Sequence, residues 1–269
     1  MFQPKYINWF IEERSVTLED GAPISCYRLD YAVEDDVFCE WALHLRQHYE
    51  SDDELKESLR ITGMTVEEYL RTYVIPQKSD AFGPTSRSND FTEVMISDLL
   101  EFIHGFTIPR CKQRNRSGKN QSEHGTDILA YKYVKSFETP DIKDELLAIE
   151  VKAGLSSDKY DPIGNAVADS KAYDEVRHAH TLNYYRKKLQ SINNEQQANE
   201  VARFQQKSEN DYLITYVAAA IISRDQIAND IVLGLRGDDL KLRHNNKIFL
   251  VHGKKLMTLA HEIFERCIK

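Results

Sequence analysis

Asp127, Glu150 and Lys152 have the types and spacing of residues that could act together on a phosphodiester. Residues 125–131 and 147–152 both read as buried strands, in which a charged side chain is costly unless it is paired or holds a metal. Because side chains alternate faces along a strand, Glu150 and Lys152 point to the same side. An aspartate from one strand and Glu-x-Lys from its neighbour would converge on one point. Two carboxylates there suit a hard divalent cation.

The role of each residue follows from its charge. We expect Asp127 and Glu150 to bind Mg²⁺ or Mn²⁺, which would polarise a phosphate and lower the pKa of a bound water. Lys152 would orient that water or stabilise the negative charge of the transition state. The alternative is a simple ion pair between Glu150 and Lys152 on a wet sheet face. The apolar run 146–149 leads directly into the motif, which favours a central strand and the catalytic interpretation.

This pattern resembles the PD-(D/E)xK nuclease superfamily, in which an aspartate at the start of one core strand precedes (Asp/Glu)-x-Lys on the next. Thr126-Asp127 stands in the place of the Pro-Asp pair. Many members add a glutamate from the preceding helix, and Glu93 occupies that place. Asp90-x-x-Glu93 is also a capping-box pattern, so Glu93 is either a further metal ligand or a helix cap.

A run of basic residues without an acidic one separates the two charged strands. A flexible basic loop at this place would bind phosphates of DNA without reading bases. The alternative is a solvated hairpin. Its members are Arg110, Lys112, Arg114, Arg116 and Lys119.

The elements around these residues have the α-β-β-β-α-β order of the superfamily core. We therefore expect an α/β (α+β) fold with a restriction-endonuclease-like core, a central mixed sheet flanked by helices. The period of the apolar residues, and the residues that end helices and strands, give the positions of the elements. The expected helices cover residues 90–105, 163–180, 183–207 and 254–268, and the strands outside the charged pair cover 106–109, 212–222 and 247–251.

The upstream part differs in its charge. The chain of 269 residues has a net charge of −8, and the first 60 residues, with 14 acidic and 6 basic side chains, hold the whole excess. A Pro-, Gly- and Ser-rich stretch over 76–89 reads as a linker. We expect a small mixed α/β N-terminal module over 1–78 and a nuclease domain over 88–269. The acidic module would contact a partner or restrain DNA access, or it is a solvated surface.

Composition indicates a soluble globular protein, with 41% hydrophobic and 29% charged residues. No apolar run is long enough to span a bilayer, and no secretory signal is visible, so we expect a cytoplasmic protein without a membrane partner. The four cysteines contain no Cys-x-x-Cys pair and suggest neither a zinc site nor a disulfide framework.

Within the superfamily the chain is similar to the HamA family, the nuclease component of the Hachiman anti-phage system. The similarity is carried by the acidic upstream module, by residues 91–100, by 125–128 and by 148–154. It implies a metal-dependent DNase that acts with a helicase, HamB. Two alternatives stay open: a restriction- or resolvase-like nuclease outside defence, and a catalytically silent nuclease fold that binds DNA or serves as a scaffold. The intact Asp127, Glu150 and Lys152 set argues against a silent module.

Overall fold

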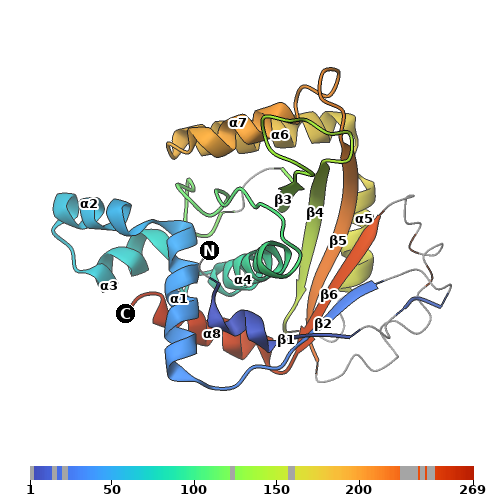
Figure 1. Cartoon of the computed structure of the whole chain (residues 1–269). Coiled ribbons are helices and arrows are strands. Elements are labelled where there is room, and N and C mark those ends of the chain that lie inside the picture. Colours follow the sequence, from blue (N-terminus) through green and yellow to red (C-terminus); the bar gives the residue numbers. More distant parts are fainter. Residues whose placement is uncertain are drawn as a thin grey trace.

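A six-stranded mixed sheet runs through the computed structural model (Figure 1). The structure describes residues 3–13, 17–19, 24–121, 125–156, 161–224, 236, 240 and 246–269. The strand order is β1-β2-β6-β5-β4-β3; the inner strands run parallel, and β1 and β3 are antiparallel edges. The strands are β1 (Phe10–Glu12), β2 (Ile24–Leu29), β3 (Ile128–Lys132), β4 (Glu145–Gly154), β5 (Leu213–Ser223) and β6 (Lys247–Gly253). The expected α/β class with a central mixed sheet is confirmed.

Helices cover both faces of this sheet (Figure 1). α1 (Asp35–Tyr49), α4 (Gly83–Asp98) and α8 (Leu256–Arg266) share one apolar core with the sheet face that carries Ile149 and Val151. α5 (Pro162–Lys171), α6 (Glu175–Ser191) and α7 (Glu195–Arg203) pack on the opposite face. The short α2 (Asp52–Thr62) and α3 (Val66–Tyr69) project beside α1. None of the helices in the described part of the chain has the length and apolarity needed to cross a membrane.

The antiparallel pairing of β3 with β4 sets the register of the charged residues. Ile128 pairs with Ile149, so Asp127, which directly precedes β3, comes beside Glu150. Ile149 and Val151 are buried in the core of the α4 face. Alternation along β4 therefore turns Glu150 and Lys152 towards the α5–α6 face, as the sequence predicts.

Three local predictions are wrong. α4 begins at Gly83, so the second half of the expected linker is helical; Pro84 suits a first helical turn, and Arg87 is fully buried, donating to the Pro76 carbonyl at 2.6 Å. The expected strand at 106–109 is only an isolated bridge between Thr107 and Tyr131.

The third difference is in the helices after β4. The helix expected over 163–180 is interrupted: α5 ends at Lys171 and α6 begins at Glu175. The Asp174 carboxylate caps α6 by accepting from the Arg177 N–H at 2.7 Å. The single helix expected over 183–207 is divided between the end of α6 and α7.

The segments upstream and downstream of the expected boundary share the sheet. β2 pairs in parallel with β6, with Ile24 opposite Ile248 and Leu29 opposite Gly253. α1 also belongs to the same apolar core as α8. A separate role for residues 1–78 and 88–269 stays a prediction, but these two segments are joined by main-chain hydrogen bonds within one sheet.

Candidate active site

Asp127 and Glu150 meet where β3 begins alongside β4. The Val151 N–H donates to Asp127 Oδ2 at 2.8 Å, and Thr126 Oγ1 lies 3.0 Å from Glu150 Oε1. Both carboxylates are thus held by neighbouring groups of the two strands. Glu150 is nearly buried, with 5% of its side chain exposed, whereas Asp127 keeps 21%. Lys152 follows on the same face of β4, and its Nζ lies 2.5 Å from Asp169 Oδ2 of α5.

Glu93 reaches the same region from the middle of α4. Gln113 Nε2 donates to Glu93 Oε2 at 3.1 Å. Because α4 begins at Gly83, Asp90 lies inside the helix and is no N-cap, so the helix-cap interpretation of Glu93 is wrong. The glutamate instead faces Lys112, whose Nζ lies 3.9 Å from Glu93 Oε2.

Lys112 bridges two of the candidate ligands. Its ammonium group lies 3.5 Å from Asp127 Oδ1 and donates to the Thr126 carbonyl at 3.2 Å. Only 4% of the side chain is exposed. On the other side of the site, Arg177 Nη2 of α6 donates to Glu150 Oε1 at 2.8 Å. Two cations of the protein thus compensate the carboxylates from opposite sides.

Burial and mutual repulsion raise the pKa of two of the carboxyl groups despite these cations. Burial raises the pKa of Glu93 to about 7, Lys112 opposes this, and repulsion from Asp127 adds to it. Burial also raises the pKa of Glu150 to about 7, with repulsion from Asp127 as the next cause, while Arg177 opposes the shift. A divalent cation would relieve this crowding of buried negative charge.

The chemistry of the oxygen donors fits Mg²⁺ or Mn²⁺ rather than a softer metal. In this structure the carboxylates of Asp127, Glu150 and Glu93 accept hydrogen bonds from other groups of the chain. Their oxygens do not form a group of three possible metal ligands within 4.8 Å of one another. A metal ion would compete with Lys112 and Arg177 for these oxygens. Among the described residues, two other clusters with acidic and histidine groups are tight enough to hold a metal ion: Glu13–Cys26–His252 and His44–His48–Asp98.

Three contacts of the site were missed in the sequence analysis. They are made by Asp169 with Lys152, by Arg177 with Glu150, and by Lys112 with Asp127. Asp169 and Arg177 lie on two different helices after β4. Their contacts with Lys152 and Glu150 depend on the break between those helices. No local pattern marks such a contact. Lys112 was expected to contact DNA, and only the fold shows that it points inward.

The five basic residues of the expected DNA-binding run all pair within the chain. Arg110 contacts Asp98 at 2.5 Å and also Glu101, and Lys112 lies in the candidate site. Arg114 Nη1 is 2.9 Å from Glu54, and Lys119 Nζ is 2.9 Å from Asp80. Arg116 forms a pair with Asp90 in which both side chains are almost fully buried. DNA contact by this run stays a prediction, and it would require the exposed members to exchange partners.

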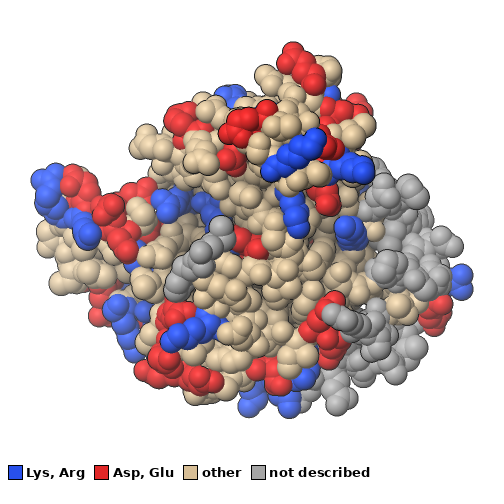
Figure 2. Space-filling model, in the orientation of Figure 1, with Lys and Arg blue, Asp and Glu red and all other residues tan. Residues whose placement is uncertain are grey.

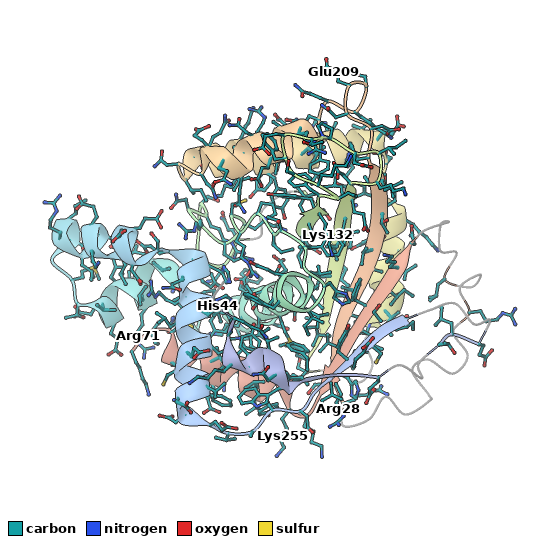
Figure 3. The ribbon with its side chains drawn as sticks, in the orientation of Figure 1. Arg28, His44, Arg71, Lys132, Glu209 and Lys255 are labelled. Atoms are coloured by element: carbon teal, nitrogen blue, oxygen red, sulfur yellow. The ribbon has the colours of Figure 1, made fainter. Side chains whose placement is uncertain are left out.

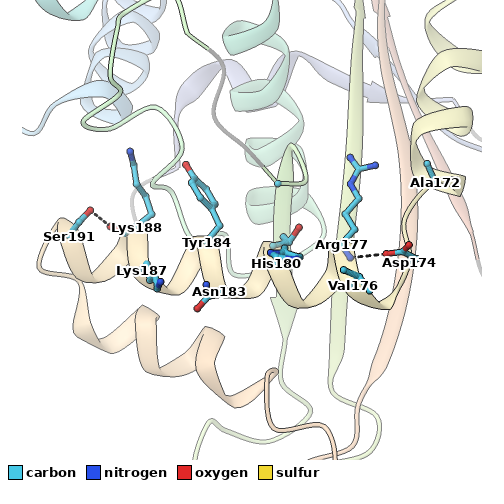
Figure 4. Close-up of a pocket in the computed structure, with 12 residues that line it drawn as sticks. Ala172, Asp174, Val176, Arg177, His180, Asn183, Tyr184, Lys187, Lys188 and Ser191 are labelled. Carbon is cyan, nitrogen blue, oxygen red and sulfur yellow. Dashed lines mark hydrogen bonds between the residues drawn. The ribbon is translucent and has the colours of Figure 1, made fainter.

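A hollow of about 890 Å³ runs along α6, and Gly125 of the loop before Asp127 is part of its lining. Arg177, Tyr184 and Lys188 project to the same side of the helix, towards that loop (Figure 4). On the face in view, acidic and basic side chains are otherwise interspersed (Figure 2). The hollow therefore combines cationic and aromatic groups, and one of them, Arg177, also contacts Glu150 of the candidate site.

Comparison with protein families matches residues 4–267 of the chain to the HamA family. The chain belongs to the HamA family. The match covers both the acidic upstream segments and the nuclease-like core, as the resemblance predicts. HamA membership supports a role related to Hachiman antiviral defence, a system in which HamA has a partner. The comparison with curated proteins found no match.

Proposed function

We propose that the chain is a metal-dependent DNA endonuclease, the nuclease subunit of a Hachiman complex that acts with a helicase. The observation that carries the proposal is the convergence of Asp127 and Glu150 at the β3–β4 pair, with Lys152 on the same face of β4. Family membership supports the defence role, and the nuclease activity follows from the chemistry of the site.

The residues would divide the reaction between them. Asp127 and Glu150 hold Mg²⁺ or Mn²⁺, with Glu93 as a third oxygen donor from α4. When bound, the metal supplies Lewis-acid polarisation of the phosphate and a more acidic water. Lys152 stabilises the charge that develops on the phosphate, and Asp169 holds the Lys152 ammonium in position until a phosphate replaces it.

Substrate would enter along the hollow on α6. Arg177 and Lys188 offer charge to the phosphate backbone, and Tyr184 offers a ring on which a base can stack. The net charge of −8 predicts weak DNA affinity for the chain alone. This supports a requirement for a partner that brings DNA to the site.

The test is Mg²⁺-dependent cleavage of linear and supercoiled DNA by the purified chain, with and without the proposed helicase partner. Chelation should abolish cleavage, and Mn²⁺ should restore it. The informative variant is Glu150→Gln, and Glu145→Gln on the same strand is its matched control. The proposal fails if the wild-type chain, with helicase and Mg²⁺, leaves both DNA forms intact.

A second candidate is a catalytically silent DNA-binding or scaffold subunit. The observation in its favour is that Lys112 and Arg177 already compensate the carboxylates in this structure. Stable DNA binding by the complex without cleavage under any divalent cation would select this candidate.

A further inference from the structure

Glu13, Cys26 and His252 converge at β1, β2 and β6, whereas the candidate active site lies at β3 and β4 of the same sheet. Cys26 Sγ lies 3.8 Å from Glu13 Oε2, and His252 Nε2 lies 3.0 Å from the same oxygen. All three donor atoms lie within 4.8 Å of one another. None of them is used by the proposed nuclease.

The fold explains why these residues meet. β2 and β6 pair in parallel with Arg28 opposite His252, so Cys26, two residues before Arg28, shares the face of His252. Glu13 follows β1, and its N–H donates to the Cys26 carbonyl at 2.9 Å. Cys26 and His252 are each only 1% exposed, whereas the Glu13 side chain is 30% exposed.

When His252 is neutral, its two contacts leave two acceptors facing each other. Its Nδ1 lies 3.3 Å from the Arg224 carbonyl oxygen, which can only accept, so this contact is a hydrogen bond when Nδ1 carries the proton. In a neutral imidazole, Nε2 then presents a lone pair, and this lone pair faces the carboxylate of Glu13 at 3.0 Å. Two acceptors at this distance repel each other, and a cation between them would make the contact favourable.

We propose that Glu13, Cys26 and His252 bind one Zn²⁺ ion. A thiolate sulfur, an imidazole nitrogen and a carboxylate oxygen are the three donor types that zinc takes in proteins. Zinc–donor distances of about 2.0–2.3 Å give tetrahedral donor–donor edges of about 3.3–3.6 Å. The observed separations of 3.8 Å and 3.0 Å bracket these edges.

The surroundings complete this site. The contact from His252 Nδ1 to the Arg224 carbonyl is the outer hydrogen bond that zinc-bound histidines typically make. A thiolate and a carboxylate together balance the charge of Zn²⁺. The Glu13 side chain is 30% exposed, and a water would be the fourth ligand. The ion would join the β1–β2 segment to β6.

The other cluster, His44–His48–Asp98, differs in where the neighbouring arginine lies. In the Glu13 cluster, Arg28 Nε is 3.5 Å from Glu13 Oε1, which is not the oxygen that faces Cys26 and His252. Arg110 Nη1 lies 3.0 Å from His48 Nε2, and Arg110 Nη2 lies 2.5 Å from Asp98 Oδ1. A guanidinium group of the protein therefore takes the place that a metal would need. His44 lies on α1 beside α4 (Figure 3), and its Nε2 is 3.0 Å from Asp98. We expect a metal-free hydrogen-bonded network there, which makes His44→Gln a matched control.

The test is metal binding by the full-length chain carrying Glu150→Gln, so that binding at the candidate active site is impaired. Zinc is removed with a chelator and the chain is titrated with Co²⁺ and then with Zn²⁺. We expect one equivalent of Co²⁺ per chain with a thiolate-to-cobalt charge-transfer band and the intense visible bands of tetrahedral cobalt. Zn²⁺ should displace it and raise the Tm.

The variants separate the proposed site from other binding. Cys26→Ala should remove the charge-transfer band, and Glu13→Ala, a change at a partly exposed position, should weaken zinc at least tenfold with the fold intact. His44→Gln should change neither. The proposal is overturned if the metal-free chain takes up no Co²⁺ with thiolate character, or if Cys26→Ala keeps the band. An imidazolium signal of His252 by NMR would then assign the contact to a salt bridge with Glu13. Neither result bears on DNA cleavage.

Discussion

At the scale of the residue, the candidate site is a balance between carboxylates and the cations that the chain itself supplies. Asp127 is held by the Val151 N–H and approached by Lys112, and Glu150 is held by Arg177. An ion or a phosphate that enters the site must therefore exchange with these partners. Single side chains in this cluster should consequently have large effects on cleavage.

Glu150→Gln and Lys152→Ala should each lower the cleavage rate by about 100-fold or more, or roughly 3 kcal/mol of transition-state stabilisation. Glu150→Gln removes a metal ligand, and Lys152→Ala removes the positive charge near the phosphate. The measurement is the rate of plasmid nicking with Mg²⁺ and the helicase, with Glu145→Gln as the matched control. Rates at the wild-type level in both folded variants would refute the assignment of this site.

A second residue-scale prediction concerns His178 on α6, whose Nε2 lies 2.8 Å from the Tyr212 hydroxyl. Burial lowers the pKa of His178 from 6.5 to about 4, and nearby Lys207 adds to this. Between these two values the unfolded chain binds the proton and the folded chain does not. The contribution of His178 to stability is thus complete above pH 6.5 and is lost as the pH falls towards about 4.

The measurement is the free energy of unfolding as a function of pH for the wild type and for His178→Gln. The variant should lose less stability between pH 6.5 and 4 than the wild type does. Identical slopes in the two proteins would show that His178 is not held neutral.

At the scale of the element, the loop after α4 is attached to its surroundings by ion pairs of very different burial. Arg116 donates two hydrogen bonds to Asp90 at 2.8 and 2.6 Å, and their side chains are 7% and 4% exposed. The Arg114–Glu54 pair is much more open, with 22% and 37% exposed. The same sequence run therefore has both structural members and members that solvent or DNA can reach.

Asp90→Ala should reduce the free energy of unfolding by about 3 kcal/mol, because it leaves a buried guanidinium without its partner. Arg114→Ala should cost less than about 1 kcal/mol, since its pair is more exposed. Chemical denaturation of the two variants checks this difference. Equal losses would mean that burial does not separate the two pairs.

The difference in burial between Arg116 and the more exposed basic residues also allows a test of DNA contact that leaves the fold undisturbed. Neutralising Arg114, Arg116 and Lys119 together should weaken DNA binding at every sequence and flatten its salt dependence. The pair Arg114→Ala and Lys119→Ala spares the buried Arg116 and should show the same salt effect in a stable chain. An unchanged slope would mean that the run only holds the loop in place.

At the scale of the whole molecule, the first 60 residues hold the acidic surplus. Two of their elements, β2 and α1, share the sheet and the apolar core with downstream elements. Four carboxylates of the surplus are highly exposed, with side-chain exposures of 81%, 70%, 53% and 95% for Asp35, Asp36, Asp52 and Asp53. Each pairs with a basic residue of the chain. Such a surface can bind a basic partner or repel DNA.

Charge reversal of these four aspartates to lysine should leave the candidate site intact. It should either weaken association with the helicase or raise cleavage by the isolated chain. Binding assays and nicking rates check the two outcomes. Reversal of four exposed acids elsewhere, Glu138, Glu195, Glu209 and Asp211, is the matched control. The regulatory proposal fails if both sets behave alike.

The sequence alone determined the elements whose pattern is local. β4, β5, β6 and α8 lie close to their predicted positions, because the types of neighbouring side chains repeat with a two-residue or a 3.6-residue period. The convergence of Asp127 with Glu150 was also predictable, because the two strands are close in sequence and a short return fixes their pairing. The family resemblance rested on this same local region.

The tertiary structure alone decided which distant segments meet. The pairing of β2 with β6, the approach of Arg177 to Glu150, and the meeting of Glu13 with His252 across 239 residues leave no local pattern. The same holds for Lys112, whose basic neighbours suggested a solvent-facing loop although its own side chain is buried. Local periodicity reports which face of an element is apolar. It carries no information about which element will cover that face, because this choice depends on how the whole chain packs its core.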